Sequence, residues 1–108
     1  ITDFQNIDAI VLPGVGAFGQ AMANLGQLNL IKPLTHMVIY QKLPFLGICL
    51  GMHMLAKCSS EMGTHAGLGW INAEVEYIRT PPGVRVPHVA WNSLNNQRNP
   101  QKKHLYGY

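Results

Sequence analysis

The stretch that decides the fold is Pro44–Met52, with the sequence PFLGICLGM. It is a short apolar run that ends in a cysteine, Cys49, placed between Gly47 and Gly51. This pattern predicts a buried β-strand that turns sharply into a helix and presents one thiol at the turn, the G-x-nucleophile-x-G elbow with Cys in place of Ser. Small residues allow the backbone to pack closely there. A helix N-terminus favours the thiolate, so Cys49 is the candidate nucleophile.

A second strand, a turn and two helices are predicted before the elbow. Residues 7–12 (IDAIVL) are typical of a buried parallel strand, and a turn follows over 13–16. Apolar residues at i, i+3, i+4 and i+7 from Phe18 predict an amphipathic helix that Gly26 ends. A further helix, capped by Asn29, is expected to run toward Gln41. The order strand, helix, strand, helix indicates an α/β fold with a parallel sheet.

The chain after the elbow is expected to become richer in strands. The elbow helix is predicted to end at about Lys57, before a loop over residues 59–67. Residues 69–78 alternate between apolar and polar, which predicts a strand with Ile71, Ala73, Val75 and Tyr77 on its buried face and the other face exposed. A turn at 80–83 and a further strand over 86–94 complete the pattern.

The composition excludes several classes of function. The chain has 108 residues, and with 12% charged and 47% hydrophobic residues most of it is expected to lie in an interior or an interface. The net charge of +3 comes from scattered basic residues, so no nucleic-acid site is expected. No apolar run is long enough to cross a membrane. The two cysteines, without a signal peptide or a glycosylation sequon, indicate a cytoplasmic setting and no disulfide.

The glycine-rich turn resembles a dinucleotide-binding fingerprint, because Gly14, Gly16 and Gly19 match G-x-G-x-x-G. That fingerprint also requires an acidic residue about twenty positions later, and residues 9–60 contain none. No cofactor is therefore expected. Such a turn can instead aim backbone N–H groups at an oxyanion, and it should lie beside Cys49 at the carboxyl ends of the two strands.

A nucleophilic thiol also needs a base. The chain has five histidines, at positions 36, 53, 65, 88 and 104. His53 lies one helical turn after Cys49, where a side chain seldom reaches the tip of an elbow, so we expect it to line the site. A metal site formed by Cys49, His53 and Cys58 lacks a second ligand pair and is not expected. These residues indicate a nucleophile without a base of its own.

Four segments in order resemble a known family. They are LPGVGAF at 12–18, GICLGM at 47–52, GLGW at 67–70 and VPHVAWN at 86–92. Together they are similar to class I glutamine amidotransferases, in the branch that forms the glutaminase subunit of imidazole glycerol phosphate synthase. The resemblance implies a flavodoxin-like α/β fold with a parallel central sheet, flanking helices and a strand-rich segment after about residue 68. It also implies a Cys, His, Glu triad that hydrolyses glutamine and supplies ammonia to a (β/α)8-barrel cyclase as heterodimer partner in histidine biosynthesis.

The resemblance also assigns roles to individual residues. Cys49 would attack the glutamine side-chain amide. The N–H groups that would hold the oxyanion belong to Gly14, Val15, Gly16 and Leu50. The residues that would contact the substrate are Gly51, His53 and Glu61. The residues that would face the cyclase are His88, Trp91 and Asn92. His53 departs from the family pattern, which has Gln at this position to contact the bound glutamine.

The resemblance implies that residues 1–108 are the central part of one amidotransferase domain. Two parts of the domain would lie outside it: the first strand and helix, and the C-terminal part with the triad His and Glu. This segment alone should therefore not hydrolyse glutamine. Two alternatives stay open. A paralogous amidotransferase would supply ammonia for amination of a sugar or another metabolite, which the His53 change favours. A non-catalytic interaction module would keep the scaffold without the chemistry.

Overall fold

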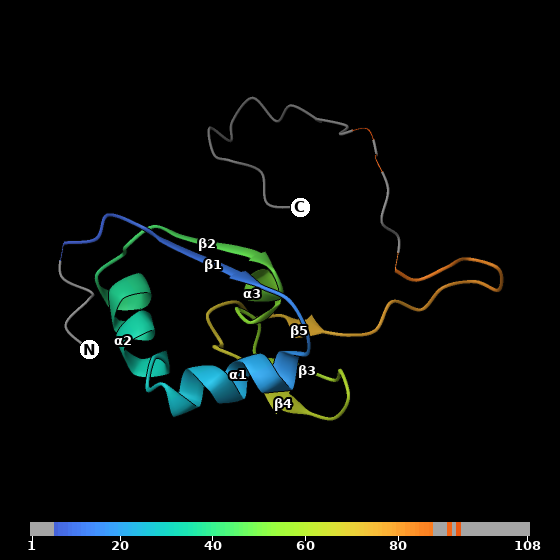
Figure 1. The fold of residues 1–108 in the computed structure, drawn as a ribbon, viewed down its shortest axis with the longest axis horizontal. Helices are drawn as coiled ribbons and strands as arrows, with labels where there is room; N and C mark the ends of the chain where they lie inside the picture. Colours follow the sequence, from blue (N-terminus) through green and yellow to red (C-terminus); the bar gives the residue numbers. More distant parts are fainter. Residues whose placement is uncertain (1–5, 88–90, 92, 94–108) are drawn as a thin grey trace. The chain divides into compact units, whose positions relative to one another are not determined.

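The computed structural model describes residues 6–87, 91 and 93. The chain divides into two compact units, residues 1–78 and 79–108, and each is described by itself. The helices and strands of the described residues all lie in the first unit (Figure 1). In chain order they are β1 (Ile10–Gly14), α1 (Phe18–Gln27), α2 (Ile31–Thr35), the π-helix η1 (His36–Tyr40), β2 (Phe45–Cys49), α3 (Leu50–His53), β3 (Cys58–Ser59), β4 (His65–Ala66) and β5 (Glu74–Val75).

β1 and β2 form the parallel pair that the sequence predicts, and they lie side by side in Figure 1. Their register runs from Ile10 opposite Phe45 to Gly14 opposite Cys49. β1 ends at Gly14, beyond the predicted strand over 7–12, so it includes the start of the predicted turn, and β2 ends on the nucleophile Cys49. The pairing therefore places the glycine turn and the elbow at one edge of the sheet.

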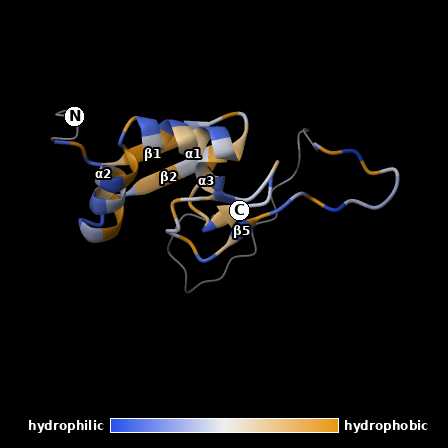
Figure 2. Cartoon of the chain, turned by 90° about the horizontal axis from the view of Figure 1, so that it is seen from below, coloured by the Kyte–Doolittle hydropathy of each residue, from blue (hydrophilic) through white to orange (hydrophobic). Residues whose placement is uncertain are grey.

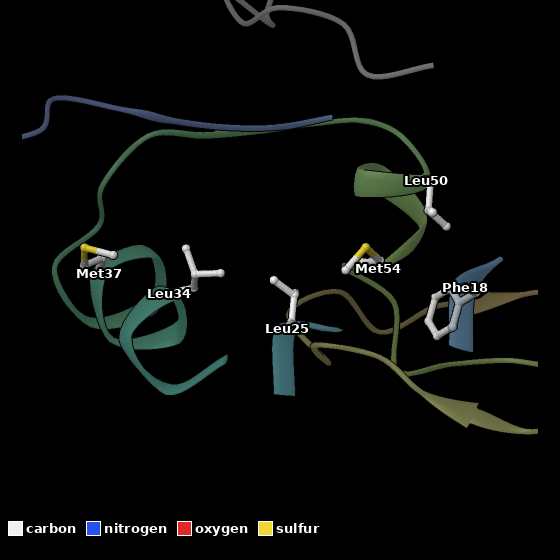
Figure 3. Close-up of a cluster of buried hydrophobic side chains, with 6 residues drawn as sticks. All are labelled: Phe18, Leu25, Leu34, Met37, Leu50 and Met54. Carbon is white, nitrogen blue, oxygen red and sulfur yellow. The ribbon is translucent and has the colours of Figure 1, made fainter. Parts of the chain in front are cut away.

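The hydrophobic core lies between this sheet and the helices. Its buried members are Phe18, Leu25, Leu34, Met37, Leu50 and Met54 (Figure 3). In Figure 2, α1 and α2 carry both hydrophilic and hydrophobic residues, as expected for helices with one buried side. Alternate residues of the strands point away from this core, so Val11 and Leu46, which are paired in register, are each 56% exposed.

Helix α1 is confirmed, but Asn29 ends it instead of capping the next helix. Asn29 has a φ of 55°, and its N–H bonds to the Gly26 carbonyl at 3.0 Å. The Leu30 N–H bonds to the Leu25 carbonyl at 3.0 Å, which completes a Schellman motif with Asn29 in the left-handed position. The helix therefore continues past Gly26 to Gln27, and Leu30 precedes α2.

The second predicted helix is present as α2 followed directly by η1. Pro33 lies in the first turn of α2, where a missing N–H costs no hydrogen bond. The Gln41 N–H then bonds to the His36 carbonyl at 3.0 Å, a spacing of five residues that defines the wider π turn.

The helix after the elbow is shorter than predicted. α3 covers Leu50–His53, whereas we expected helix to about Lys57. The carbonyls of Met54 and Ala56 instead accept hydrogen bonds from the backbone N–H groups of residues 68 and 69, at 2.8 and 3.0 Å. Because a distant segment supplies these donors, the chain satisfies its backbone without continuing the helix.

The segment predicted as a loop over residues 59–67 contains strand pairing. β3 pairs antiparallel with β4 and parallel with β5, which gives the order β4-β3-β5. The predicted strand over 69–78 is reduced to Glu74–Val75. Ile71 and Tyr77 were expected on its buried face, yet they are 50% and 62% exposed, because the pairing with β3 extends over two residues only.

The second unit shows the predicted turn at its start. The Val84 N–H bonds to the Pro81 carbonyl at 3.1 Å, and Gly83 has a φ of 90°. Of the strand predicted over 86–94, Val86 and Pro87 are not in a strand, and most of the other positions lie outside the described residues. No helix in the part of the chain that the structure describes is long and apolar enough to cross a membrane.

Candidate active site

Cys49 is held in a backbone conformation that favours glycine. Its φ is 54° and its ψ is −118°, values that a residue with a Cβ adopts only under strain. The residue ends β2 and immediately precedes α3, and it is exposed. The chain therefore turns abruptly at the thiol and leaves it accessible, as the elbow pattern predicts.

The two glycines that frame the thiol have no room for a side chain. A Cβ on Gly51 would overlap the carbonyl oxygen of Leu12 in β1. A Cβ on Gly47 would lie 2.7 Å from the carbonyl oxygen of Gly51 and 2.7 Å from the Cα of Met52. The start of α3 thus packs directly on the backbones of both strands. This close packing confirms the structural reason for the G-x-C-x-G spacing.

The glycine turn meets the elbow at the sheet edge. Gly14 pairs with Cys49, and a Cβ on Gly14 would lie 3.1 Å from the Cβ of Leu50. Gly16 has a φ of 96°, and Val15 is 93% exposed. Within the described residues, the N–H groups of Val15 and Gly16 have no protein acceptor. Leu50 begins α3, so its N–H has no partner within the helix.

Glu61 contacts the start of α1, which follows the glycine turn directly in sequence. Its Oε2 accepts a hydrogen bond from the Phe18 N–H at 3.4 Å, across 43 residues of sequence. The Glu61 N–H in turn bonds to the Oγ of Ser59 at 3.1 Å, and Ser59 is fully buried. Sequence reasoning missed this contact. One sequence feature could have indicated it: Ala17 cannot cap α1 with its side chain, and the first turn of the helix contains no acidic residue. The helix therefore needs an acceptor from another part of the chain.

Within the described residues, neither His53 nor Cys58 forms a hydrogen bond or a disulfide with the Cys49 thiol. His53 ends α3 and is half-buried, and within the described residues neither its ring nor the Cys49 thiol makes a hydrogen bond. Cys58 belongs to β3, in the other sheet, and is a free cysteine. The part of the chain that the structure describes holds no group of three His, Cys, Asp or Glu residues suited to a metal ion.

The expected partner-facing residues fall in the second unit. Trp91 is fully exposed. His88 and Asn92 lie outside the described residues. Their roles at an interface stay predictions.

The chain is similar in sequence to a known protein family and to individual proteins. Residues 2–106 match the family model described as glutamine amidotransferase class-I. The chain is 51% identical over 90 residues to imidazole glycerol phosphate synthase subunit HisH 2 of Vibrio vulnificus (strain YJ016), which covers 83% of this chain and 42% of the relative. It is 52% identical over 87 residues to the subunit HisH of Aquifex aeolicus (strain VF5), covering 81% of this chain and 41% of that relative. The chain therefore spans less than half the length of these relatives.

Proposed function

The chain belongs to the class I glutamine amidotransferase family, and we propose that the whole protein hydrolyses glutamine with Cys49 as the nucleophile. We further propose that the ammonia goes to a (β/α)8-barrel cyclase that forms imidazole glycerol phosphate. The observation that carries the first proposal is the exposed Cys49 on a strained elbow, in register with Gly14 of the glycine turn. The names of the relatives, subunits of imidazole glycerol phosphate synthase, support the second.

The proposed reaction begins with attack of the Cys49 thiolate on the side-chain carbonyl carbon of glutamine. A C–S bond forms, and the oxygen takes the negative charge of a tetrahedral intermediate. When the intermediate collapses, the C–N bond breaks, the nitrogen takes up a proton and ammonia leaves. The γ-glutamyl thioester that remains is then hydrolysed by water, which releases glutamate and restores the thiol. The base for the proton transfers is the histidine that the family resemblance implies, outside residues 1–108.

The oxyanion would be held by backbone N–H groups at the sheet edge. The proposed donors are those of Gly14, Val15, Gly16 and Leu50. The pairing of Gly14 with Cys49 supports this assignment, as does the lack of protein acceptors for the Val15 and Gly16 N–H groups among the described residues. Fixed donors of this kind stabilise developing charge without reorganising, and each is worth about 10²- to 10³-fold in rate.

Three further residues are proposed to serve substrate binding. His53 and Glu61 would contact glutamine directly, His53 from the end of α3 and Glu61 from the segment after β3. Gly51 is buried against Leu12 of β1, so we propose that it acts through the shape of the elbow. Trp91, with His88 and Asn92, is proposed to face the cyclase.

A second candidate function rests on His53. An imidazole in place of the family's Gln changes the hydrogen-bonding groups offered to the substrate. A paralogous amidotransferase that aminates a sugar or another metabolite would accommodate this change. Affinity capture with the whole protein separates the two, because the proposed function predicts retention of a (β/α)8-barrel cyclase. Retention of a sugar-modifying enzyme and no cyclase would favour the alternative.

The test of glutaminase activity uses the full-length protein together with the cyclase. Glutamate release from glutamine is measured for the wild type, for Cys49→Ala and for Cys58→Ala as the matched thiol control. We expect Cys49→Ala to lower the rate by about 10³-fold or more, because removing a nucleophile removes the covalent pathway. Cys58→Ala should retain the wild-type rate. Equal rates for Cys49→Ala and the wild type would refute the proposal, and a wild type without activity would favour the interaction module.

A further inference from the structure

Helix α1 begins without any local group to satisfy its first N–H. Ala17 precedes the helix and has no side chain that can accept a hydrogen bond, and the first turn contains no acidic residue. The Ala21 N–H is the first to bond within the helix, to the Ala17 carbonyl at 3.1 Å. The Phe18 N–H therefore depends on an acceptor from elsewhere, and Glu61 supplies it. A carboxylate at this position also interacts favourably with the helix dipole.

Glu61 is itself hydrogen-bonded to β3, the central strand of the three-stranded sheet β4-β3-β5. The Oγ of Ser59 accepts from the Glu61 N–H, and Ser59 is fully buried in β3, between β4 and β5. A second contact lies next to the first, because a Cβ on Gly19 would come within 2.6 Å of the His65 ring. The hairpin of β3 and β4 thus meets α1 at two successive positions, Phe18 and Gly19.

The glycine turn lies between two fixed points. At one end, Gly14 is paired with Cys49 of β2. At the other end, Phe18 is fully buried and bonded to Glu61. Residues 15–17 connect these two anchors, and a glycine with a φ of 96° stands among them. The position of Phe18 therefore limits where the N–H groups of Val15 and Gly16 can point.

We infer that Glu61 is a positioning residue that orients the proposed oxyanion turn by holding the start of α1. This inference rests on the proposed function and adds a second role for Glu61 besides contact with substrate. The two roles are compatible, since within the described residues Oε2 accepts from Phe18 and Oε1 accepts no hydrogen bond from the protein. They are also separable, because a glutamine at this position keeps an acceptor for the Phe18 N–H and loses the charge.

The test combines amide exchange with steady-state kinetics in the full-length protein. Hydrogen exchange at the Phe18 amide is followed by NMR in the wild type, in Glu61→Ala, in Glu61→Gln and in Glu76→Ala, an exposed carboxylate that serves as the matched control. We expect Glu61→Ala to speed exchange at Phe18 by about 5-fold or more through loss of one hydrogen bond. Glu61→Gln and Glu76→Ala should leave this exchange close to the wild type.

The kinetics separate positioning from substrate binding. We expect Glu61→Ala to lower kcat for glutamate release by about 10-fold, because a displaced donor stabilises the oxyanion less well. Glu61→Gln should restore most of kcat and raise KM, since the lost charge acts on the bound substrate. If Glu61→Ala does not fold, Ser59→Ala is used, and it should also speed exchange at Phe18.

Two outcomes would overturn the inference. One is unchanged exchange at Phe18 in the variants that remove or loosen Glu61. The other is a kcat in Glu61→Gln as low as in Glu61→Ala, which would make the charge and not the helix contact the cause. A wild type that releases no glutamate would instead refute the proposed function, while the exchange measurement would still report on the contact between Glu61 and Phe18.

Discussion

At the scale of single residues, Cys49 combines an exposed thiol with a backbone geometry that suits glycine. A φ of 54° with a ψ of −118° matches the first central position of a type II′ turn. Strain of this kind costs about 1–3 kcal/mol and persists only where the surroundings impose it. Here the surroundings are the strand pairing on one side and the packing of α3 on the other.

We expect Cys49→Gly to be more stable than Cys49→Ala and to be equally inactive. Relief of the strain outweighs the added flexibility of the unfolded chain, so the free energy of unfolding should differ by about 1 kcal/mol. Urea unfolding of the two full-length variants measures this difference. An alanine variant as stable as the glycine variant would show that the elbow is not strained.

The elbow glycines should tolerate substitution far less well than a glycine inside α1. In Gly51→Ala the new methyl would overlap the Leu12 carbonyl, and we expect a loss of about 3 kcal/mol in the free energy of unfolding. Gly26→Ala is the control. A Cβ at this position would contact only the Ile31 Cδ1, at 4.0 Å. Gly26→Ala should therefore raise the free energy of unfolding by about 0.5–1 kcal/mol. Equal free energies of unfolding for Gly51→Ala and Gly26→Ala, measured with urea, would contradict this packing.

The residues at the elbow could be predicted from the sequence, because an apolar run that leads into a cysteine between two glycines is a local pattern. Asn29 could not be assigned, since the same residue type favours both the start of a helix and the left-handed position that ends one. The contact of Glu61 with Phe18 was missed for another reason. It spans 43 residues and depends on how β3 packs, which no local pattern encodes.

At the scale of elements, the first half of the chain was predictable and the second half less so. β1 and β2 lie in continuous apolar runs, and α1 shows the helical spacing of apolar residues, so each element can be identified from the sequence. The extent of α3 depends instead on hydrogen bonds between the chain after His53 and residues 67–71. The small sheet of β3, β4 and β5 has strands of two residues, too short for an alternating pattern.

Trp70 connects α2 to β2 through two separate contacts. Its Nε1 donates to the Thr35 Oγ at 3.2 Å, and its ring lies 5.1 Å from the Phe45 ring, edge to face. Trp70→Phe removes this hydrogen bond together with part of the indole ring, so it should lower the free energy of unfolding by about 1 kcal/mol or more. A double-mutant cycle with Thr35→Val should give a coupling of about 0.5–1.5 kcal/mol. Additive effects would show that the hydrogen bond contributes nothing.

At the scale of the whole molecule, the described sheet leaves apolar residues uncovered. Val11, Leu46 and Ile48 are between 47% and 56% exposed on the strands that carry the site. Parallel sheets are usually covered on both faces. The chain covers 42% and 41% of the two relatives, and we propose that further segments of the protein cover this face of the sheet.

We expect residues 1–108 alone to release no glutamate from glutamine, even with the cyclase present. The described residues bring no histidine into hydrogen-bonding contact with the Cys49 thiol, and a thiol without a base is a poor catalyst. The measurement compares this segment with the full-length protein at equal concentration. Turnover by the segment at the full-length rate would show that its own residues complete the site.

The central claim is that Cys49 forms the covalent intermediate with glutamine. The most direct test is mass spectrometry of peptides from the full-length protein, acid-quenched during turnover with glutamine and the cyclase. We predict a γ-glutamyl thioester on the peptide that contains Cys49, and no adduct on the peptide that contains Cys58. Turnover without an adduct on Cys49, or with the adduct on Cys58, would contradict the account.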